Sequence, residues 1–175
     1  MSIELVYARE PVPAGRPSVM LLGPTAVAGT IPSWRPRAVE LIEAGWRGDE
    51  PLVVLTPESR GGVRARTYED QLASELEMIE SADAAMFWIP RDVVLLPGFT
   101  TNVEFGLIAG TCPERAVLGA PPDCPNPERN RYLIWHARRL GIPVCDTLPE
   151  TVFAALALVT ARHERTEGSR LPIAG

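Results

Sequence analysis

Residues 19–24 read Val-Met-Leu-Leu-Gly-Pro, four consecutive apolar residues followed by a turn-forming pair. Such a short, uniformly apolar run is typical of a strand that is buried on both faces, and the Gly-Pro pair marks its end. Because a strand of this kind needs cover on both sides, the run predicts a parallel sheet inside a layered α/β domain. Four further runs of the same type follow along the chain, at residues 52–55, 84–89, 116–118 and 142–145.

The segments between the apolar runs carry apolar residues at helical spacing. In one of them Leu72, Leu76 and Ile79 share one face, which we interpret as an amphipathic helix. Thr100 to Ala109 opens with threonines and is expected to be a short helix. The complete set of expected helices covers residues 33–45, 68–82, 100–109, 129–140 and 149–165.

Strands that alternate with helices favour a flavodoxin-like, doubly wound three-layer domain. We expect a five-stranded parallel sheet in the order 2-1-3-4-5. Residues 1–17, rich in proline toward their end, are assigned to an N-terminal lead-in. Residues 18–165 form a single domain, and residues 166–175 form a tail.

The composition indicates an ordinary globular domain. The chain has 175 residues, of which 46% are apolar and 22% charged. Its net charge of −5 argues against a nucleic acid polymer as partner. No stretch approaches the ~18 apolar residues of a membrane span, so no membrane partner is expected. The three cysteines lack paired spacing, which favours reduced thiols and a cytoplasmic location.

All 17 basic side chains are arginine. The absence of lysine excludes a Walker A phosphate loop, Schiff-base chemistry and the kinase strand-lysine ion pair. Metal-ligand spacings are also missing from the sequence. We therefore expect neither a metal nor an organic cofactor.

A doubly wound sheet binds ligands beyond the carboxyl ends of its strands, near the point where the strand order reverses. In the expected order this point lies between the first and third strands. Gly23 and Pro24 follow the first strand and are expected to form the floor of the site, since glycine allows a close backbone approach. Trp34 is either a stacking wall for a planar ring or a cover for the helix start.

Two aspartates bracket the third strand. Asp92 follows its end and is well placed for a ligand, whereas Asp83 precedes it and approaches the site only if the strand is shorter or bent. Trp88, near the strand exit, is either core or a pocket wall for a planar base. Arg91 is the only arginine in this stretch and is the candidate for a phosphate or acidic group.

Glu104 is the candidate catalytic residue. The spacing Thr101-x-x-Glu104 fits a capping box, in which the glutamate only satisfies the helix start. The same position in a first helical turn favours the ionised form, which suits a nucleophile. The two interpretations of Glu104 are compatible.

These segments together resemble the nucleoside 2-deoxyribosyltransferase-like family. The likeness covers residues 18–157 and rests on Gly23-Pro24, on Asp83 to Pro90 and on Thr-Thr-Asn-Val-Glu104-Phe-Gly106. Arg131-Tyr-Leu and Gly141-Ile-Pro-Val continue it. The usual D-x-G-T-x-x-E stretch of the family lacks its aspartate here, where the sequence is Pro-Gly-Phe-Thr-Thr-Asn-Val-Glu.

The resemblance implies cleavage or transfer of the N-glycosidic bond of a nucleoside or nucleoside 5′-monophosphate. Glu104 would attack the sugar C1′ and form a glycosyl-enzyme, and Asp83 or Asp92 would serve the leaving base. Thr101 and Asn102 would hold sugar hydroxyls, and Trp34 or Trp88 would stack on the base. Relatives complete their pocket from a neighbouring subunit, which implies a homo-oligomer.

Two alternatives remain open. Leu-Pro-Gly98-x-Thr-Thr-x-x-Glu104 is also similar to the phosphate loop of the LOG-type nucleotide phosphoribohydrolases, although only one of that loop's three glycines is present. That family likewise cleaves an N-glycosidic bond. The other alternative is a non-catalytic nucleotide-binding or partner module with the same fold.

Overall fold

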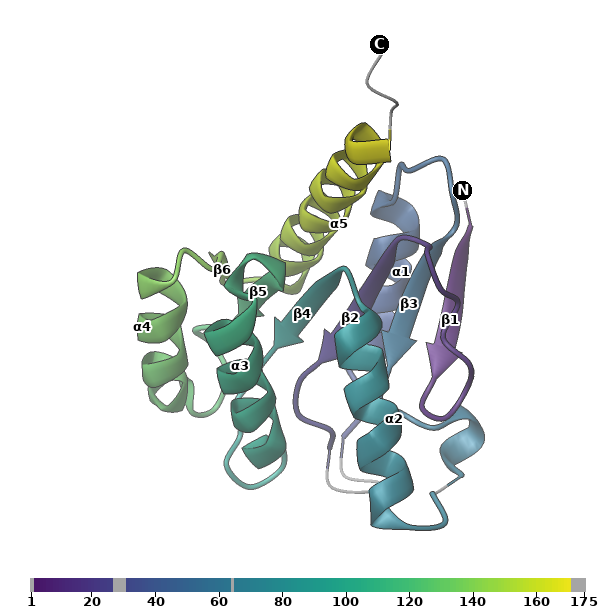
Figure 1. Cartoon of the computed structure of the whole chain (residues 1–175). Coiled ribbons are helices and arrows are strands. Elements are labelled where there is room, and N and C mark those ends of the chain that lie inside the picture. The colour runs from purple at the N-terminus through teal and green to yellow at the C-terminus, as the bar shows by residue number, and fades with distance from the viewer. Residues whose placement is uncertain (1, 27–30, 64, 171–175) are drawn as a thin grey trace.

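The computed structural model describes residues 2–26, 31–63 and 65–170. Within them a single sheet of six parallel strands runs through the molecule, in the order β1-β3-β2-β4-β5-β6 (Figure 1). The strands are β1 (Ile3–Tyr7), β2 (Ser18–Leu22), β3 (Leu52–Thr56), β4 (Ala84–Trp88), β5 (Ala116–Gly119) and β6 (Val144–Cys145).

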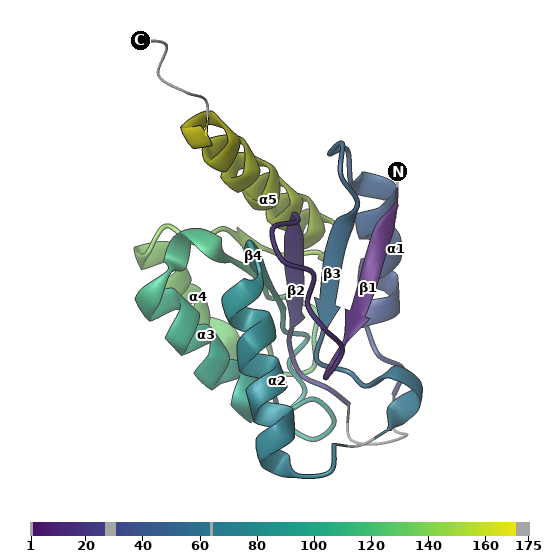
Figure 2. The same cartoon turned by 45° about the vertical axis from the view of Figure 1, so that its right-hand side comes forward.

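The expected strand count and order are wrong for the sheet as a whole. Ile3–Tyr7, within the segment assigned to a lead-in, adds a sixth strand that pairs with β3 over five residue pairs (Figure 2). The other five strands keep the expected relative order. The sequence signal of β1 is weak because an edge strand needs fewer apolar residues than a central strand. Glu4, in the middle part of β1, is exposed.

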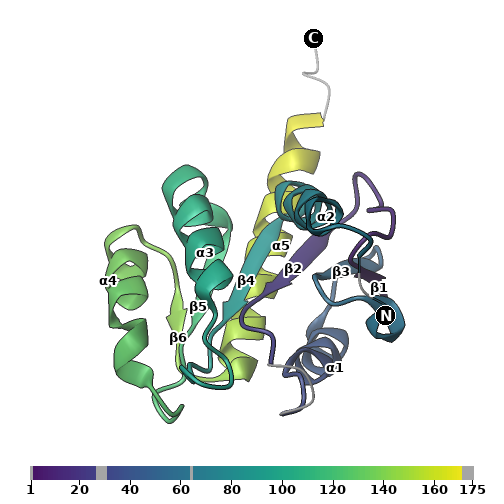
Figure 3. The ribbon, with the colours of Figure 1, turned by 90° about the horizontal axis from the view of Figure 1, so that it is seen from below.

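Helices cover both faces of the sheet, which confirms the three-layer α/β architecture (Figure 3). One face carries α1 (Arg35–Gly45) and α5 (Leu148–Arg170), and the other carries α2 (Tyr68–Ser81), α3 (Phe99–Thr111) and α4 (Arg131–Arg139). Three single-turn 3₁₀ helices lie between these elements, at Arg60–Gly62, Pro113–Arg115 and Pro127–Asn130.

The core follows from the apolar strands. All residues of β2, β3 and β4 are buried, so each strand contributes side chains to both faces. Phe87 meets Phe105 of α3 edge-to-face at 5.2 Å between ring centroids on one face, while Val19 and Met86 pack with Ile42 on the other. Each such buried side chain stabilises the fold by roughly 1.5–3 kcal/mol.

Two local expectations are corrected. In α2, Leu72 and Leu76 are exposed, whereas Ile79 of the predicted stripe packs against the core beside the buried Met78, so only part of the stripe faces the core. Helix α5 continues to Arg170, beyond the expected start of the tail at residue 166. Residues 171–175 of the expected tail lie outside the described residues. None of the described helices is long and apolar enough to cross a membrane.

Candidate active site

A large open cleft lies at the carboxyl ends of β2, β3 and β4, where the strand order reverses. Its volume is about 1110 Å³, which is large enough for a nucleotide-sized ligand. Five segments line it: the loop after β2, the loop after β3, the start of α2, the start of α3 and the first residue of α1. Residues that these segments contribute to the lining include Gly23, Pro24, Arg35, Glu58, Arg66, Tyr68, Glu75, Phe99, Thr100 and Glu104.

Glu104 lies in this cleft, but not in the first turn of its helix. Gly98 adopts a left-handed conformation (φ 60°) and caps α3, which therefore begins at Phe99, earlier than the threonines suggest. Glu104 is consequently in the second turn, and the first turn of α3 contains no acidic residue. The expected capping box at Thr101 and Glu104 does not form.

A capping box does form elsewhere in the chain. At the start of α5, the Thr147 N–H donates to Glu150 Oε2 (3.0 Å), and the Glu150 N–H donates to Thr147 Oγ1 (3.3 Å). Since α3 is capped by a glycine backbone instead, Glu104 is left without a structural task at the helix start. Its carboxyl group faces the cleft.

The environment of Glu104 keeps the carboxyl partly protonated near neutral pH. Its pKa is raised from 4.5 to about 7: burial is the largest cause, the negative charge of Glu75 acts in the same direction, and the positive charge of Arg35 opposes both. The environment of Glu104 thus works against the ionised form that a position in the first helical turn would favour. The reason is that desolvation outweighs the helix dipole, which acts mainly within the first turn.

Arg35 is a buried cation at the base of the cleft and was not identified from the sequence. The residue is 2% exposed. The guanidinium donates to the carbonyls of Leu21 (3.3 Å) and Gly23 (2.8 Å) and forms an ion pair with Glu58 at 3.1 Å. It also lies against Thr25, with 3.3 Å between Nη1 and Oγ1. Burial lowers the pKa of Arg35, with Glu58 opposing the shift.

Two further carboxylates, Glu58 and Glu75, were also missed. Glu58 follows the carboxyl end of β3, and its Oε1 accepts from Ser33 Oγ at 2.6 Å as well as from Arg35. Glu75 comes from α2 and accepts from Gln71 Nε2 at 2.6 Å. The strand-end rule would have indicated Glu58 had it been applied to the second strand. No sequence signal marked Glu75, because it lies within a helix rich in carboxylates.

Gly23 and Pro24 line the cleft as expected, and the structure shows why residue 23 is glycine. Its φ is +152°, and an added Cβ would lie 2.2 Å from the carbonyl oxygen of Trp88. The backbone of β2 therefore approaches the end of β4 more closely than any side chain allows.

The two aspartates do not join Glu104. Asp83 precedes β4 and therefore lies at the amino ends of the strands. The length of the strand separates it from the cleft by roughly 17 Å. There it accepts from the N–H (3.0 Å) and hydroxyl (3.1 Å) of Ser18 and pairs with Arg162 at 3.1 Å. Asp92 Oδ1 accepts the N–H groups of Val94 (2.8 Å) and Leu95 (3.0 Å), which closes its own turn outside the cleft.

The two predicted tryptophans serve packing. The Trp34 indole N–H donates to the Pro24 carbonyl at 3.2 Å, and the ring lies behind Gly23 rather than in the cleft. Trp88 is 8% exposed and covers Gly119, where an added Cβ would lie 2.4 Å from the ring. Two other aromatic rings, Tyr68 and Phe99, line the cleft and are 65% and 77% exposed.

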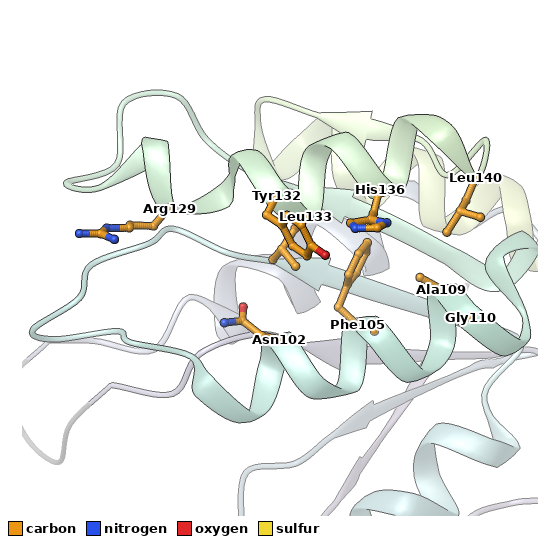
Figure 4. Close-up of a pocket in the computed structure, with 10 residues that line it drawn as sticks. Asn102, Phe105, Ala109, Gly110, Arg129, Tyr132, Leu133, His136 and Leu140 are labelled. Carbon is orange, nitrogen blue, oxygen red and sulfur yellow. The ribbon is translucent and has the colours of Figure 1, made fainter.

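Arg91, Thr101 and Asn102 also lie away from the cleft. Arg91 is 3% exposed, and its guanidinium donates to Asn130 (3.0 Å), to Asn102 (2.7 Å) and to the backbone carbonyls of Pro97 and Gly98. Thr101 is buried. Asn102 faces a separate groove between α3 and α4 (Figure 4). Of the two neighbouring threonines, Thr100 lines the cleft and Thr101 does not.

Among the described residues no group of three His, Cys, Asp or Glu side chains is arranged to hold a metal ion. Comparison of the chain with protein-family models and with curated proteins gives no match.

Proposed function

We propose that this cleft cleaves or transfers the N-glycosidic bond of a nucleoside or nucleoside 5′-monophosphate. The observation that carries the proposal is the position of Glu104. Of the three carboxylates that the sequence suggests, it alone lies in the large cleft, beside Glu75 and the buried Arg35. A carboxylate pair is the machinery that glycosidic bond cleavage requires.

In the proposed first step, a Glu104 carboxylate oxygen forms a bond to the sugar C1′ while the bond from C1′ to the base nitrogen breaks. The electron pair leaves with the base, which takes a proton from water in the open cleft. In the second step, a water oxygen or the nitrogen of another base attacks C1′ and displaces the Glu104 carboxylate, while the proton of the attacking water or N–H group passes to the Glu75 carboxylate. Glu75 thus takes the acid–base role that the sequence suggested for Asp83 or Asp92.

The surroundings of Glu104 support this chemistry. A carboxyl group with a pKa of about 7 exchanges its proton readily near neutral pH. The positive charge that develops on the sugar favours the ionised form of Glu104 in the transition state. The resulting free carboxylate has Arg35 nearby as a fixed positive charge.

The rim of the cleft supports a nucleoside-like substrate. Tyr68 and Phe99 offer two exposed rings from neighbouring helix starts, and a flat base is suited to stacking on either. Arg66, also exposed, lies on the same rim and provides a guanidinium for a 5′-phosphate. These residues replace Trp34, Trp88 and Arg91 in the proposed recognition of base and phosphate.

A panel of deoxyribonucleosides, ribonucleosides and their monophosphates tests the proposal. Each compound is incubated with the protein, and free base is measured by chromatography. Release of base from at least one member is expected, and a second added base distinguishes transfer from hydrolysis by a new nucleoside product. If no member gives released or exchanged base, the proposed function is wrong.

A further inference from the structure

Helices α2, α3 and α4 leave an apolar surface open on one side of the molecule. Residues four apart form a stripe on α2 (Tyr68, Leu72, Leu76) and another on α3 (Phe99, Val103, Leu107), and all six are exposed. On α4, Tyr132 and Trp135 are exposed as well. These eight side chains are called the helical face below; exposed apolar side chains gathered on neighbouring helices are typical of a protein–protein contact surface.

The arrangement of the stripes is regular. Each stripe follows the i, i+4, i+8 positions of its helix, as the contact face of a packed helix does. The buried side chains of the same helices, such as Met78, Phe105 and Leu133, face the sheet. Helices α2 and α3 are therefore apolar on two sides, one for the core and one that the single chain leaves uncovered.

Charge is segregated across this face. Helix α2 has five carboxylates (Glu69, Asp70, Glu75, Glu77 and Glu80) and no basic residue. Helix α4 has three arginines (Arg131, Arg138 and Arg139) and no acidic residue. Helix α3 lies between them across the sheet, as Figures 1 and 3 show, and carries only the charge of Glu104.

We propose that the helical face is the interface of a two-fold symmetric homodimer, with the symmetry axis running parallel to α3. This arrangement places acidic α2 of each copy on basic α4 of the other, and α3 on α3. A two-fold axis perpendicular to the helices would instead oppose α2 to α2 and α4 to α4, which brings like charges together. The charge pattern thus selects both the occupant, a second copy, and its orientation.

A groove between α3 and α4 provides a place for the apolar stripe of α2. Its volume is about 420 Å³, and its walls combine Phe105, Ala109 and Leu133 with two glycines, Gly106 and Gly110. Figure 4 shows Phe105 reaching from α3 toward His136 of α4 at the bottom of this groove. The glycines leave the α3 wall open, since an added Cβ at either would meet no atom within 4 Å. Leu72 and Leu76 of the second copy fit this apolar space.

The dimer also affects the cleft. Tyr68 and Phe99 belong both to the helical face and to the cleft lining. All three helices begin at the carboxyl ends of the strands, so an axis parallel to α3 sets both clefts at the same end of the dimer. The start of α4 from the second copy, with Arg131, then lies beside Tyr68 at the cleft mouth.

Sedimentation and light scattering of Leu107→Arg test the interface. Leu107 is 62% exposed on α3, so the arginine leaves the fold intact but meets its own copy at the axis. We expect a dimer for the wild type and a monomer for Leu107→Arg, each with unchanged circular dichroism. Phe153→Arg is the matched control, because Phe153 is 67% exposed on α5, and this variant stays dimeric. A monomeric wild type, or a dimer that survives Leu107→Arg, overturns the proposal.

A charge-reversal pair tests the orientation. Glu77→Arg with Glu80→Arg makes the last turn of α2 basic, and Arg138→Glu with Arg139→Glu makes the last turn of α4 acidic. Each double variant alone should dimerise at least tenfold more weakly, and mixing the two should restore dimers that contain one copy of each. Mixing that restores nothing overturns the parallel axis.

Discussion

At the scale of single residues, Glu104 illustrates how one glycine changes the chemistry of a carboxylate. Because Gly98 adopts a left-handed conformation, α3 starts one residue before the threonines and Glu104 moves into the second turn. Away from the helix end it gains little from the dipole and is desolvated by the cleft walls. A local backbone choice thus converts an ordinary surface acid into a group that titrates near neutrality.

The raised pKa of Glu104 predicts that Glu104→Gln stabilises the protein at pH 8. A carboxyl whose pKa rises from 4.5 to about 7 on folding binds its proton more tightly in the folded state, so its contribution to stability decreases as pH rises between these values. Above pH 7 the cost is on the order of 2–3 kcal/mol, which glutamine avoids. Urea unfolding at pH 8 and pH 4.5 measures this; a variant less stable than the wild type at pH 8 would contradict it.

The same pKa predicts the pH dependence of turnover. As a nucleophile Glu104 must be ionised, so kcat/KM should fall about tenfold per pH unit below pH 7 and level off above it. The profile is measured with whichever substrate releases base. A loss of activity as pH rises through 7 would assign Glu104 the proton-donor role instead.

Gly23 gives a prediction for the cleft floor. Gly23→Ala should lower the free energy of unfolding by on the order of 3 kcal/mol, since the methyl group meets the Trp88 carbonyl and the φ of +152° is strained for alanine. Thermal unfolding measures the effect. Gly106→Ala is the control, because it lies within a helix with open space around it and should gain about 0.5–1 kcal/mol. Equal stability of the two variants would contradict the close approach.

At the scale of secondary-structure elements, Arg35 connects three segments that are distant in the sequence. From the first residue of α1 it holds the carbonyls at the end of β2 and the carboxylate of Glu58 after β3. Its positive charge also reaches Glu104 on α3. The strand ends supply the backbone of the cleft, and this single side chain fixes their relative positions.

Arg35→Met is expected to destabilise the protein by about 3–5 kcal/mol, because it removes the cationic partner of Glu58 and the donor to two backbone carbonyls. It should also raise the pKa of Glu104 further, which moves the pH profile of turnover to higher pH. Arg37→Met is the matched control, since its pair with Glu40 is exposed and contributes less than about 1 kcal/mol. Similar stability losses in both variants would show that Arg35 has no special role.

The elements show which parts of the site could be predicted from sequence. Strand ends are predictable because apolar runs stop at recognisable turns, and this rule correctly placed Gly23, Pro24 and Glu104 in the cleft. Arg35 and Glu75 could not be predicted, since they reach the cleft from helix positions that depend on packing. Asp92 and Arg91 also follow a strand end. However, Asp92 accepts hydrogen bonds from the N–H groups of its own turn, and Arg91 donates to Asn102, so both side chains are engaged within the protein.

At the scale of the whole molecule, the alternation of apolar runs and helices in the sequence was sufficient to predict the three-layer architecture. It was insufficient to predict β1, because the five residues of this strand carry little apolar pattern and the strand is recognised only by its pairing with β3. It also misassigned the stripe of Leu72 and Leu76, because periodicity marks a contact face without saying what that face contacts. The proposed dimer gives this stripe a partner.

The measurement that tests the central proposal most directly compares base release by three proteins. Wild type, Glu104→Gln and Glu43→Gln are assayed with the best substrate of the nucleoside panel. Glu43 is the control because it lies exposed on α1, outside the cleft and on the face of the sheet opposite α2, α3 and α4. We expect Glu104→Gln to lose at least a factor of ~10³ in kcat while it remains folded, and Glu43→Gln to match the wild type. Normal turnover by Glu104→Gln would contradict the assignment of Glu104 as the nucleophile.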